Sequence, residues 1–269
     1  MLYWLYQNVM LKVIQITDCH IKSMPNAELR GVNVDRSLKA VLEHIKTWHT
    51  PLDLVLATGD LTHDDPAAYP RFKAMLEPLA TPVYCLPGNH DMPAELAAQC
   101  ADGQVQRQRH VQHKGWQFIL LDTSVPGSPN GNLAASELDF LQYSLNQHPA
   151  LPTLVCLHHH PVSVGCAWLD TQMIANADEL FAILHQHPQV RAVVWGHVHQ
   201  THTGQHGHFG LYGTPATSCQ FTPESEQPSI EHLALPGYRW FNLYPDGRLE
   251  TGIARVPYPL PAAARQQHD

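Results

Sequence analysis

The chain has 269 residues, of which 44% are apolar and 15% are charged, and its formal net charge is −8. This composition is typical of a folded protein with a sizeable core, and it excludes an intrinsically disordered chain. The acidic balance, without any run of five like charges, argues against a nucleic-acid binder that relies on a basic face.

The predicted elements alternate between short apolar strands and amphipathic helices through the first two thirds of the chain. Strands are indicated by β-branched apolar runs, and helices by apolar residues spaced three and four apart. In chain order they are a strand at Leu11–Thr17, a helix at Val32–His49, a strand at Leu52–Thr58, a helix at Pro66–Leu79, a strand at Pro82–Leu86, a helix at Pro93–Cys100, a strand at Trp116–Asp122, a helix at Ser136–His148, a strand at Thr153–Leu157, a helix at Ala175–His187 and a strand at Ala192–Trp195.

The last part of the chain is expected to contain strands only, with glycine and proline between them. These strands are placed at Phe209–Tyr212, Ala216–Phe221, Tyr238–Leu243 and Leu249–Val256. Strands that alternate with helices, followed by strands alone, predict an α/β fold with outer helices and two sheets stacked face to face. No repeat or linker divides the sequence, so we expect one domain.

The N-terminus and the cysteines bear on where the protein works. The segment Met1–Met10 is apolar, but it lacks the features of a secretion signal and is too short to span a bilayer. Met1 and Met10 both stay open as starts, because Met10 lies just ahead of the first strand. The six cysteines are scattered, which favours reduced thiols over a disulfide framework. We therefore expect a cytoplasmic protein without membrane association.

Metal-capable side chains follow five of the predicted strands, at the point where each strand ends. In an open α/β sheet, ligands bind beyond the carboxyl ends of the strands. The 20 histidines point the same way, because histidine is the commonest metal ligand. The side chains are Asp18 with His20, Asp60, the run Asn89–Asp91, the run His158–His160, and His197 with His199. Each group alone is a common turn or cap, but together they predict one metal site.

These same residues give the chain a resemblance to the calcineurin-like metallophosphoesterase family. The family's blocks D-x-H, G-D, G-N-H-D, H and G-H-x-H occur in order between about Lys12 and Phe221. Within the family, the stretches KVIQITDCH, LPGNHD and TPATSCQF are most similar to bacterial class III 3′,5′-cyclic AMP phosphodiesterases. The resemblance implies a four-layer α/β/β/α sandwich with mixed sheets. The sandwich is expected to form one domain over residues 1–269, with its core at about 11–256 and short extensions at both ends.

By this resemblance, seven residues are expected to hold two divalent metal ions. Asp60 would bridge the ions; Asp18, His20 and His199 would bind one, and Asn89, His158 and His197 the other. Nitrogen and oxygen ligands without a thiolate favour iron or manganese, with zinc or cobalt as alternatives. The triple histidine leaves a choice between His158, which the family pattern favours, and His159. Neighbours on a strand point to opposite faces, so only one of the two is expected to face the metal.

The resemblance also assigns the residues that meet the substrate. His90 is expected to contact the phosphate and to protonate the leaving oxygen, with Asp91 orienting its ring. A role for His90 as a further metal ligand stays open. The expected set at the phosphate is His20, Asp60, Asn89, His90, His158 and His199. Arg30, Asn33 and Trp168 lie in loops that either shape a pocket for base or ribose or serve only as rim and packing residues.

The expected reaction is the hydrolysis of 3′,5′-cyclic AMP to 5′-AMP by a hydroxide that bridges the two metal ions. Two ions about 3.5–4 Å apart clamp a phosphodiester and generate hydroxide near neutral pH. The alternative enzyme is a broad phosphodiesterase or phosphomonoesterase acting on glycerophosphodiesters or nucleotides, and the alternative from another class is a His-rich metal-binding protein. The expected partner is a small phosphodiester, not nucleic acid or a membrane, and a homodimer is compatible with the sequence.

Overall fold

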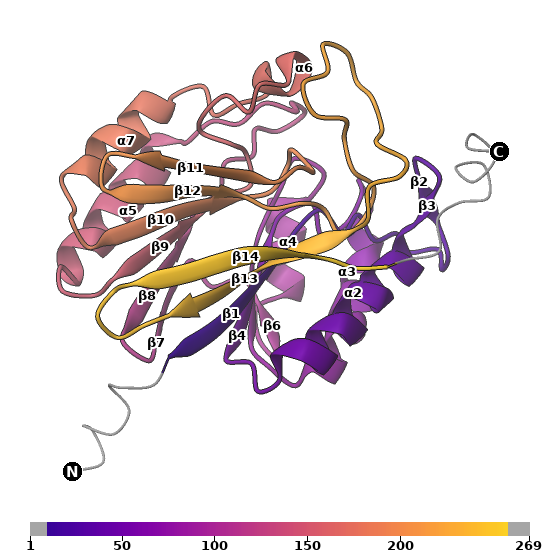
Figure 1. The fold of residues 1–269 in the computed structure, drawn as a ribbon, viewed down its shortest axis with the longest axis horizontal. Helices are drawn as coiled ribbons and strands as arrows, with labels where there is room; N and C mark the ends of the chain where they lie inside the picture. The colour runs from indigo at the N-terminus through magenta and orange to yellow at the C-terminus, as the bar shows by residue number, and fades with distance from the viewer. Residues whose placement is uncertain (1–9, 258–269) are drawn as a thin grey trace.

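The fold is built from two six-stranded sheets that lie face to face (Figure 1). The structure is a computed structural model, and it describes residues 10–257. The expectations about the start of the chain and about short extensions at both ends fall on residues 1–9 and 258–269, outside this range.

The first sheet has the strand order β14-β13-β1-β4-β5-β6. Its strands are β1 (Leu11–Ile16), β4 (Leu54–Thr58), β5 (Val83–Leu86), β6 (Val105–Gln106), β13 (Gly237–Leu243) and β14 (Leu249–Arg255). β1, β4, β5 and β6 run parallel, whereas β13 and β14 are antiparallel to their neighbours. The helices on its outer face are α2 (Val34–His49), α3 (Tyr69–Leu76) and α4 (Pro93–Gln99), with 3-10 turns η2 (Pro66–Ala68) and η3 (Glu77–Leu79) on either side of α3.

The second sheet has the strand order β11-β12-β10-β9-β8-β7. Its strands are β7 (His110–His113), β8 (Trp116–Leu120), β9 (Thr153–Cys156), β10 (Val190–Trp195), β11 (His202–His206) and β12 (Phe209–Gly213). The helices on its outer face are α5 (Ala135–Gln147) and α7 (Ala177–His185). In residues 10–257, no helix has the length and apolar character needed to cross a bilayer.

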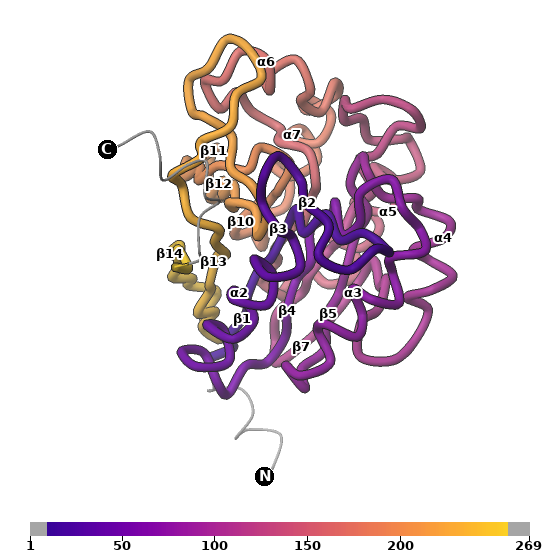
Figure 2. The backbone as a smooth tube through the Cα atoms, turned by 90° about the vertical axis from the view of Figure 1, so that its right-hand side faces the viewer, coloured from indigo at the N-terminus to yellow at the C-terminus, as the bar shows by residue number. Residues whose placement is uncertain are grey.

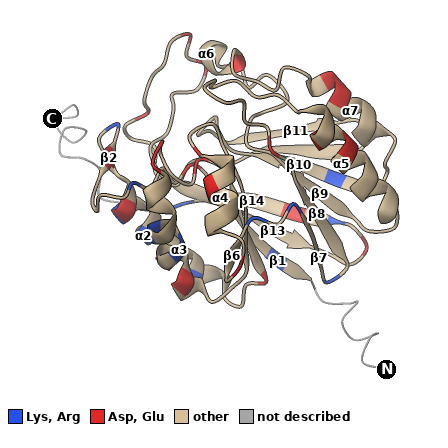
Figure 3. Cartoon of the chain, turned by 180° about the vertical axis from the view of Figure 1, so that it is seen from behind, with Lys and Arg blue, Asp and Glu red and all other residues tan. Residues whose placement is uncertain are grey.

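Three apolar clusters separate four layers. Leu11 and Val13 of β1 point into the cluster between the two sheets, where Trp116 of the second sheet meets them. Ile14 and Ile16 point the other way, toward the helices α2, α3 and α4. This alternation is what a strand buried on both faces requires. Most charged residues lie on the outer helices and loops (Figure 3). The α/β/β/α sandwich with mixed sheets is thus confirmed.

The structure departs from the predicted elements in one segment and adds several short ones. The prediction of a strand at Ala216–Phe221 is wrong, because this segment is irregular apart from a bridge between Phe221 and Ile230. Its polar groups bond to the loop after β1, since Thr217 N donates to Thr17 O (3.0 Å), which replaces a strand ladder. The elements not predicted are β6, β7, β11, the hairpin of β2 (Glu28–Leu29) and β3 (Val32–Asn33), and the short helix α6 (Ala167–Asp170).

Candidate active site

The five predicted strand ends meet at one edge of the two sheets. β1, β4 and β5 are parallel, as are β9 and β10, so the carboxyl ends of each set share one side. Main-chain hydrogen bonds join the loops within each sheet: Asp18 N donates to Gly59 O (3.0 Å), and Gly196 N donates to His158 O (3.1 Å). The sheets are linked to each other because His197 N donates to the Asp18 carboxylate (3.0 Å).

Asp18, His20 and His199 form one buried cluster whose ligand atoms lie within 4.8 Å of one another. Nε2 of His199 lies 3.1 Å from Oδ1 of Asp18 and 3.3 Å from Nε2 of His20. The resemblance assigned these three residues to one metal ion, and the fold brings them together from β1 and β10.

Asp60, Asn89 and His158 form the second group, and His197 joins it through His158, with ring centroids 5.1 Å apart. Nε2 of His158 lies 3.1 Å from Oδ1 of Asn89 and 3.4 Å from Oδ2 of Asp60. The same Asp60 oxygen lies 3.7 Å from Nε2 of His20, in the first cluster. One carboxylate oxygen therefore lies between the two groups, which is the position that a bridging ligand requires.

The donor atoms at this edge fit metal binding by their orientation as well as by their spacing. Nδ1 of His158 donates to Thr58 O (2.9 Å) and Nδ1 of His199 donates to Cys219 O (2.7 Å), which turns Nε2 of each ring toward a carboxylate, Asp60 for His158 and Asp18 for His199. Burial lowers the pKa of both rings, but these carboxylates outweigh it and hold both pKa values above the usual one, so metal binding would release a proton from each Nε2. Nε2 of His197 is buried and has no hydrogen-bond partner in the described chain. Burial lowers the pKa of His197 well below its usual value, so this imidazole is neutral, the form that binds metal.

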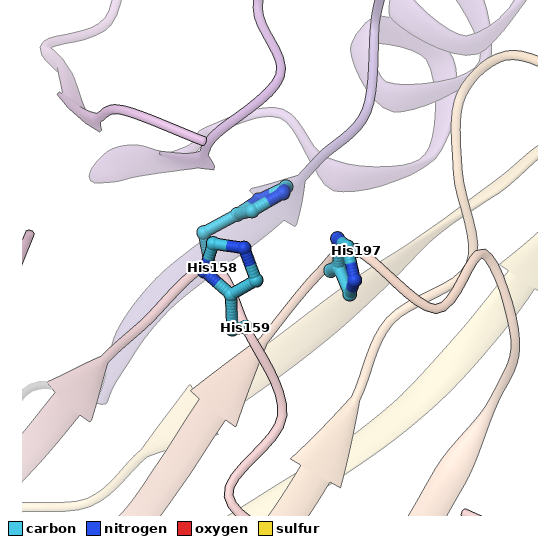
Figure 4. A group of neighbouring side chains, drawn as sticks. All are labelled: His158, His159 and His197. Atoms are coloured by element: carbon cyan, nitrogen blue, oxygen red, sulfur yellow. The ribbon is translucent and has the colours of Figure 1, made fainter. Parts of the chain in front are cut away.

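The triple histidine places two rings near the site rather than one. His158, His159 and His197 offer nitrogens within 4.8 Å of one another, and Figure 4 shows their rings side by side. β9 ends at Cys156, so the alternation of a strand does not apply to the next residues, and the expectation that only one ring faces the site is wrong. His158 is the ring that meets Asn89 and Asp60, whereas His159 accepts or donates a hydrogen bond at Thr123 Oγ1 (2.7 Å).

Five of the metal-capable residues have left-handed backbone conformations. The φ angles are 53° at Asp18, 50° at His20, 49° at Asp60, 63° at His197 and 49° at His199. Such φ values are uncommon outside glycine and cost roughly 1–2 kcal/mol per residue. Here they turn the chain sharply at the end of each strand, which aims successive side chains into the same small volume.

His90 lies at the edge of this group and is held by a residue that the sequence analysis did not single out. Both Oδ atoms of Asp64 lie 3.2 Å from Nδ1 of His90. The ring of His63 stacks on the ring of His90, with centroids 4.3 Å apart, and Nδ1 of His63 lies 3.0 Å from Nδ1 of His20. His63 and Asp64 follow Asp60 in the same loop. Their position in that loop was the sequence feature that could have predicted their place at the site.

The expected role of Asp91 is wrong. Its carboxylate accepts hydrogen bonds from Leu61 N (3.1 Å), Gly88 N (3.0 Å) and the Tyr69 hydroxyl (3.0 Å), and it does not contact the His90 ring. Asp91 is buried and turned back toward the loop after β4, whereas the neighbouring His90 side chain is turned toward solvent. Asp91 therefore clamps the Asp60 loop to the loop that carries Asn89.

A cavity of about 790 Å³ opens over the metal-capable residues. Arg30 and Trp168 line it, as one of the two readings of these loops anticipated. Asn33 instead caps α2, because its Oδ1 accepts from Arg36 N (3.0 Å). Phe221 and Gln172 also line the cavity and were not singled out, since nothing local in the sequence connects them to it.

Two clusters with one carboxylate between them, at the carboxyl edge of a four-layer sandwich, are the arrangement of a dinuclear-site hydrolase of the phosphoesterase class. The chain belongs to the calcineurin-like phosphoesterase family, whose profile matches residues 11–201. The resemblance is thereby confirmed, and the chain is an enzyme that hydrolyses phosphoesters.

Among its relatives is a 3′,5′-cyclic-nucleotide phosphodiesterase of Nostoc sp., 39% identical, with 93% of this chain and 94% of the relative covered. The 3′,5′-cyclic adenosine monophosphate phosphodiesterase CpdA of Pseudomonas aeruginosa is 38% identical, with 91% and 89% covered. A dimetal phosphatase from Danio rerio is similar in fold, with a TM-score of 0.66, 14% identity, and coverage of 92% of this chain and 99% of that one.

Proposed function

We propose that this enzyme hydrolyses 3′,5′-cyclic AMP to 5′-AMP at a site that holds two divalent metal ions. The observation that carries the proposal is the position of the Asp60 carboxylate, whose Oδ2 lies 3.4 Å from Nε2 of His158 and 3.7 Å from Nε2 of His20. The relatives named as cyclic-nucleotide phosphodiesterases support the choice of substrate.

In this proposal the chain holds the ions through oxygen and neutral nitrogen donors. The proposed ligands of one ion are Asp18, His20 and His199, those of the other are Asn89, His158 and His197, and Asp60 is shared. When bound, the ions withdraw charge from the phosphoryl oxygens and activate water for attack on phosphorus. This donor chemistry suits iron, manganese, zinc or cobalt rather than magnesium or calcium. Of these we propose iron or manganese, with zinc or cobalt as alternatives.

His90 is the proposed general acid. Its Nδ1 faces the Asp64 carboxylate, so the proton available to a substrate is the one on Nε2. That proton would pass to the ribose 3′-oxygen as its bond to phosphorus breaks, which yields a free hydroxyl and 5′-AMP. A positioned acid of this kind contributes on the order of 10²–10⁴-fold to the rate. The contact with the Asp64 carboxylate fixes the orientation of the ring.

Two further proposals concern where the enzyme works and how many domains it has. We infer that the enzyme works in the cytoplasm, because all six cysteines are buried and unpaired, as reduced thiols are. We also infer that the chain is one folding domain. β1 at its start pairs with β13 near its end, so neither half of the chain contains a complete first sheet.

The test is elemental analysis and a cyclic AMP hydrolysis assay on the same purified sample. We expect two tightly bound ions per chain and a higher kcat/KM for cyclic AMP than for glycerophosphodiesters or aryl phosphodiesters. Equal kcat/KM values would contradict the cyclic AMP assignment and favour a broad phosphodiesterase. Many loosely bound ions without turnover would instead indicate a metal-binding protein.

A further inference from the structure

One wall of the cavity is aromatic and begins directly at the metal-capable residues. The ring of Phe221 stacks on the ring of His199, with centroids 4.1 Å apart and planes inclined by 15°. Trp168 meets Phe221 edge to face, at 4.9 Å and 74°. Both aromatic residues line the cavity. If the phosphate of a substrate lies at the proposed ions, the part of the substrate that does not react lies beside these aromatic rings.

This wall is held in place by contacts between two segments that are distant in sequence. α6 carries Trp168 and lies beside the loop that follows Phe221, as Figures 1 and 2 both show. Cys166, which precedes α6, donates from Sγ to Ser225 O in that loop (3.3 Å). Phe221 is bridged to Ile230 across the base of the loop. The wall is therefore a formed surface rather than a loop that must order on binding.

Two polar groups on this side of the cavity have no partner in the described part of the chain. The indole Nε1 of Trp168 is buried without a hydrogen bond. The side-chain amide of Gln172, two residues beyond α6, likewise forms no hydrogen bond with a described residue, although Gln172 is half-buried and lines the cavity. Trp168 Nε1 has almost no accessible surface, so the half-buried amide of Gln172 is the polar group that a ligand in the cavity can reach.

We propose that Trp168, Phe221 and Gln172 form the subsite for the purine base of the substrate, and that Gln172 makes this subsite prefer adenine. The proposal rests on the cyclic-nucleotide activity proposed above and names where that substrate's base lies. An aromatic wall fits any base, because every base offers a flat apolar face. A glutamine amide carries one donor group and one acceptor, which matches the N6 donor and N7 acceptor of adenine. Guanine presents two acceptors, O6 and N7, on the corresponding edge.

The test compares variants on three cyclic substrates that differ only in the base: 3′,5′-cyclic AMP, 3′,5′-cyclic GMP and the base-free 3′,5′-cyclic phosphate of methyl riboside. Trp168→Leu removes part of the wall, and Gln172→Met keeps the length of the side chain but removes its amide. The matched controls are Trp48→Leu on α2, where Trp48 is 70% exposed, and Gln147→Met at the exposed end of α5. Metal content is measured for every variant.

For Trp168→Leu we expect KM for cyclic AMP to rise on the order of tenfold, since stacking on an aromatic ring is worth about 1–3 kcal/mol per base. Its kcat, its metal content and its kcat/KM for the base-free substrate are expected to stay within about threefold of wild type. For Gln172→Met we expect the preference for cyclic AMP over cyclic GMP to fall on the order of tenfold. Both controls are expected to match wild type on all three substrates.

Three results would overturn the proposal. One is an equal loss of kcat/KM on cyclic AMP and on the base-free substrate in Trp168→Leu, because the wall would then act on the phosphate end. The second is an unchanged KM for cyclic AMP in that variant. The third is an unchanged nucleotide preference in Gln172→Met. Failure of the proposed activity looks different: the wild-type enzyme itself would leave all three cyclic phosphates intact.

Discussion

The floor and the rim of the cavity are built on different principles. The floor consists of side chains at strand ends, almost all of them buried, and its loops are joined by main-chain hydrogen bonds. The rim consists of α6, the β2–β3 hairpin and the loop after Phe221, and most of its side chains are half-buried or exposed. Among residues 10–257, Trp168 of the rim and Gln172 just beyond α6 have polar groups without a hydrogen-bond partner, whereas His158 and His199 of the floor are each fixed by a backbone carbonyl.

This contrast indicates that the floor and the rim have different functions. A floor that is buried and tied to both sheets suits metal binding, which tolerates little displacement of the ligands. A rim of short elements with free polar groups suits recognition of the part of the substrate that does not react. Changes in the floor are therefore expected to alter metal content and kcat together, and changes in the rim to alter KM and substrate preference.

The largest expected effect tests the floor at its centre. Asp60→Ala removes the shared carboxylate, so we expect loss of bound metal and a fall in kcat on the order of 10³-fold or more. Elemental analysis and a cyclic AMP assay measure the two quantities together. Asp139→Ala, an exposed position on α5, is the control. Full turnover by Asp60→Ala would show that this carboxylate is not the bridge.

The next effect tests whether His90 and Asp64 work as a unit between floor and rim. We expect His90→Gln to lower kcat for cyclic AMP on the order of 10²-fold, because the sugar oxygen is a poor leaving group without an acid. Asp64→Asn is expected to give a smaller loss, since it keeps the side-chain shape but removes the charge beside Nδ1. A p-nitrophenyl phosphodiester, whose leaving group needs no acid, should lose little in either variant. Equal losses on both substrates would exclude the acid role.

A third prediction concerns His63, which lines the cavity beside the floor and supports it. Nδ1 of His63 lies 3.0 Å from Nδ1 of His20, so it orients the ring of a proposed ligand. We expect His63→Phe, which keeps an aromatic ring over His90, to weaken metal affinity about 10–100-fold, as loss of such partners does. Competition with a chelator measures this affinity. His63→Asn restores a polar atom near Nδ1 and should recover most of it; equal affinities in the two variants would contradict the role.

The smallest expected effect concerns the clamp under the floor. Tyr69→Phe removes the hydroxyl that donates to Asp91 (3.0 Å) and accepts from Met92 N (3.0 Å). We expect a loss of about 1–3 kcal/mol in unfolding free energy with metal affinity changed less than in His63→Phe. Thermal unfolding monitored by circular dichroism measures the loss. Unchanged stability would mean that the backbone donors and the Thr62 hydroxyl hold Asp91 without the Tyr69 hydroxyl.

The sequence predicted the floor far better than the rim, for a physical reason. Asp18, Asp60 and His197 directly follow strands that their own apolar pattern reveals, and parallel strands bring those ends together whatever else the chain does. The rim depends on contacts between segments that are far apart in sequence, such as the contact between Phe221 and Trp168. No periodicity in either segment reveals that contact.

Two of the errors near the site have related causes. Asp91 was assigned to His90 because the two are adjacent in sequence, but the turn places their side chains in opposite directions, and Asp91 serves backbone donors instead. The run Ala216–Phe221 has the composition of a strand, yet its partners are the loops of the site. In both places the conformation is determined by hydrogen bonds to other loops. Those loops come near only in the folded chain, so the local sequence does not reveal the bonds.

The left-handed conformations in the floor set activity against stability. At Asp18 and His199 the backbone angle is one that glycine adopts without cost, whereas a side chain there destabilises the native state. A glycine at His199 is expected to relieve that strain while removing a proposed ligand, whereas at Asp18 it would also remove the carboxylate that links the two sheets. Selection for robustness alone would thus erode this site, and mutational screens for heat resistance in the metal-free protein should enrich inactive enzymes.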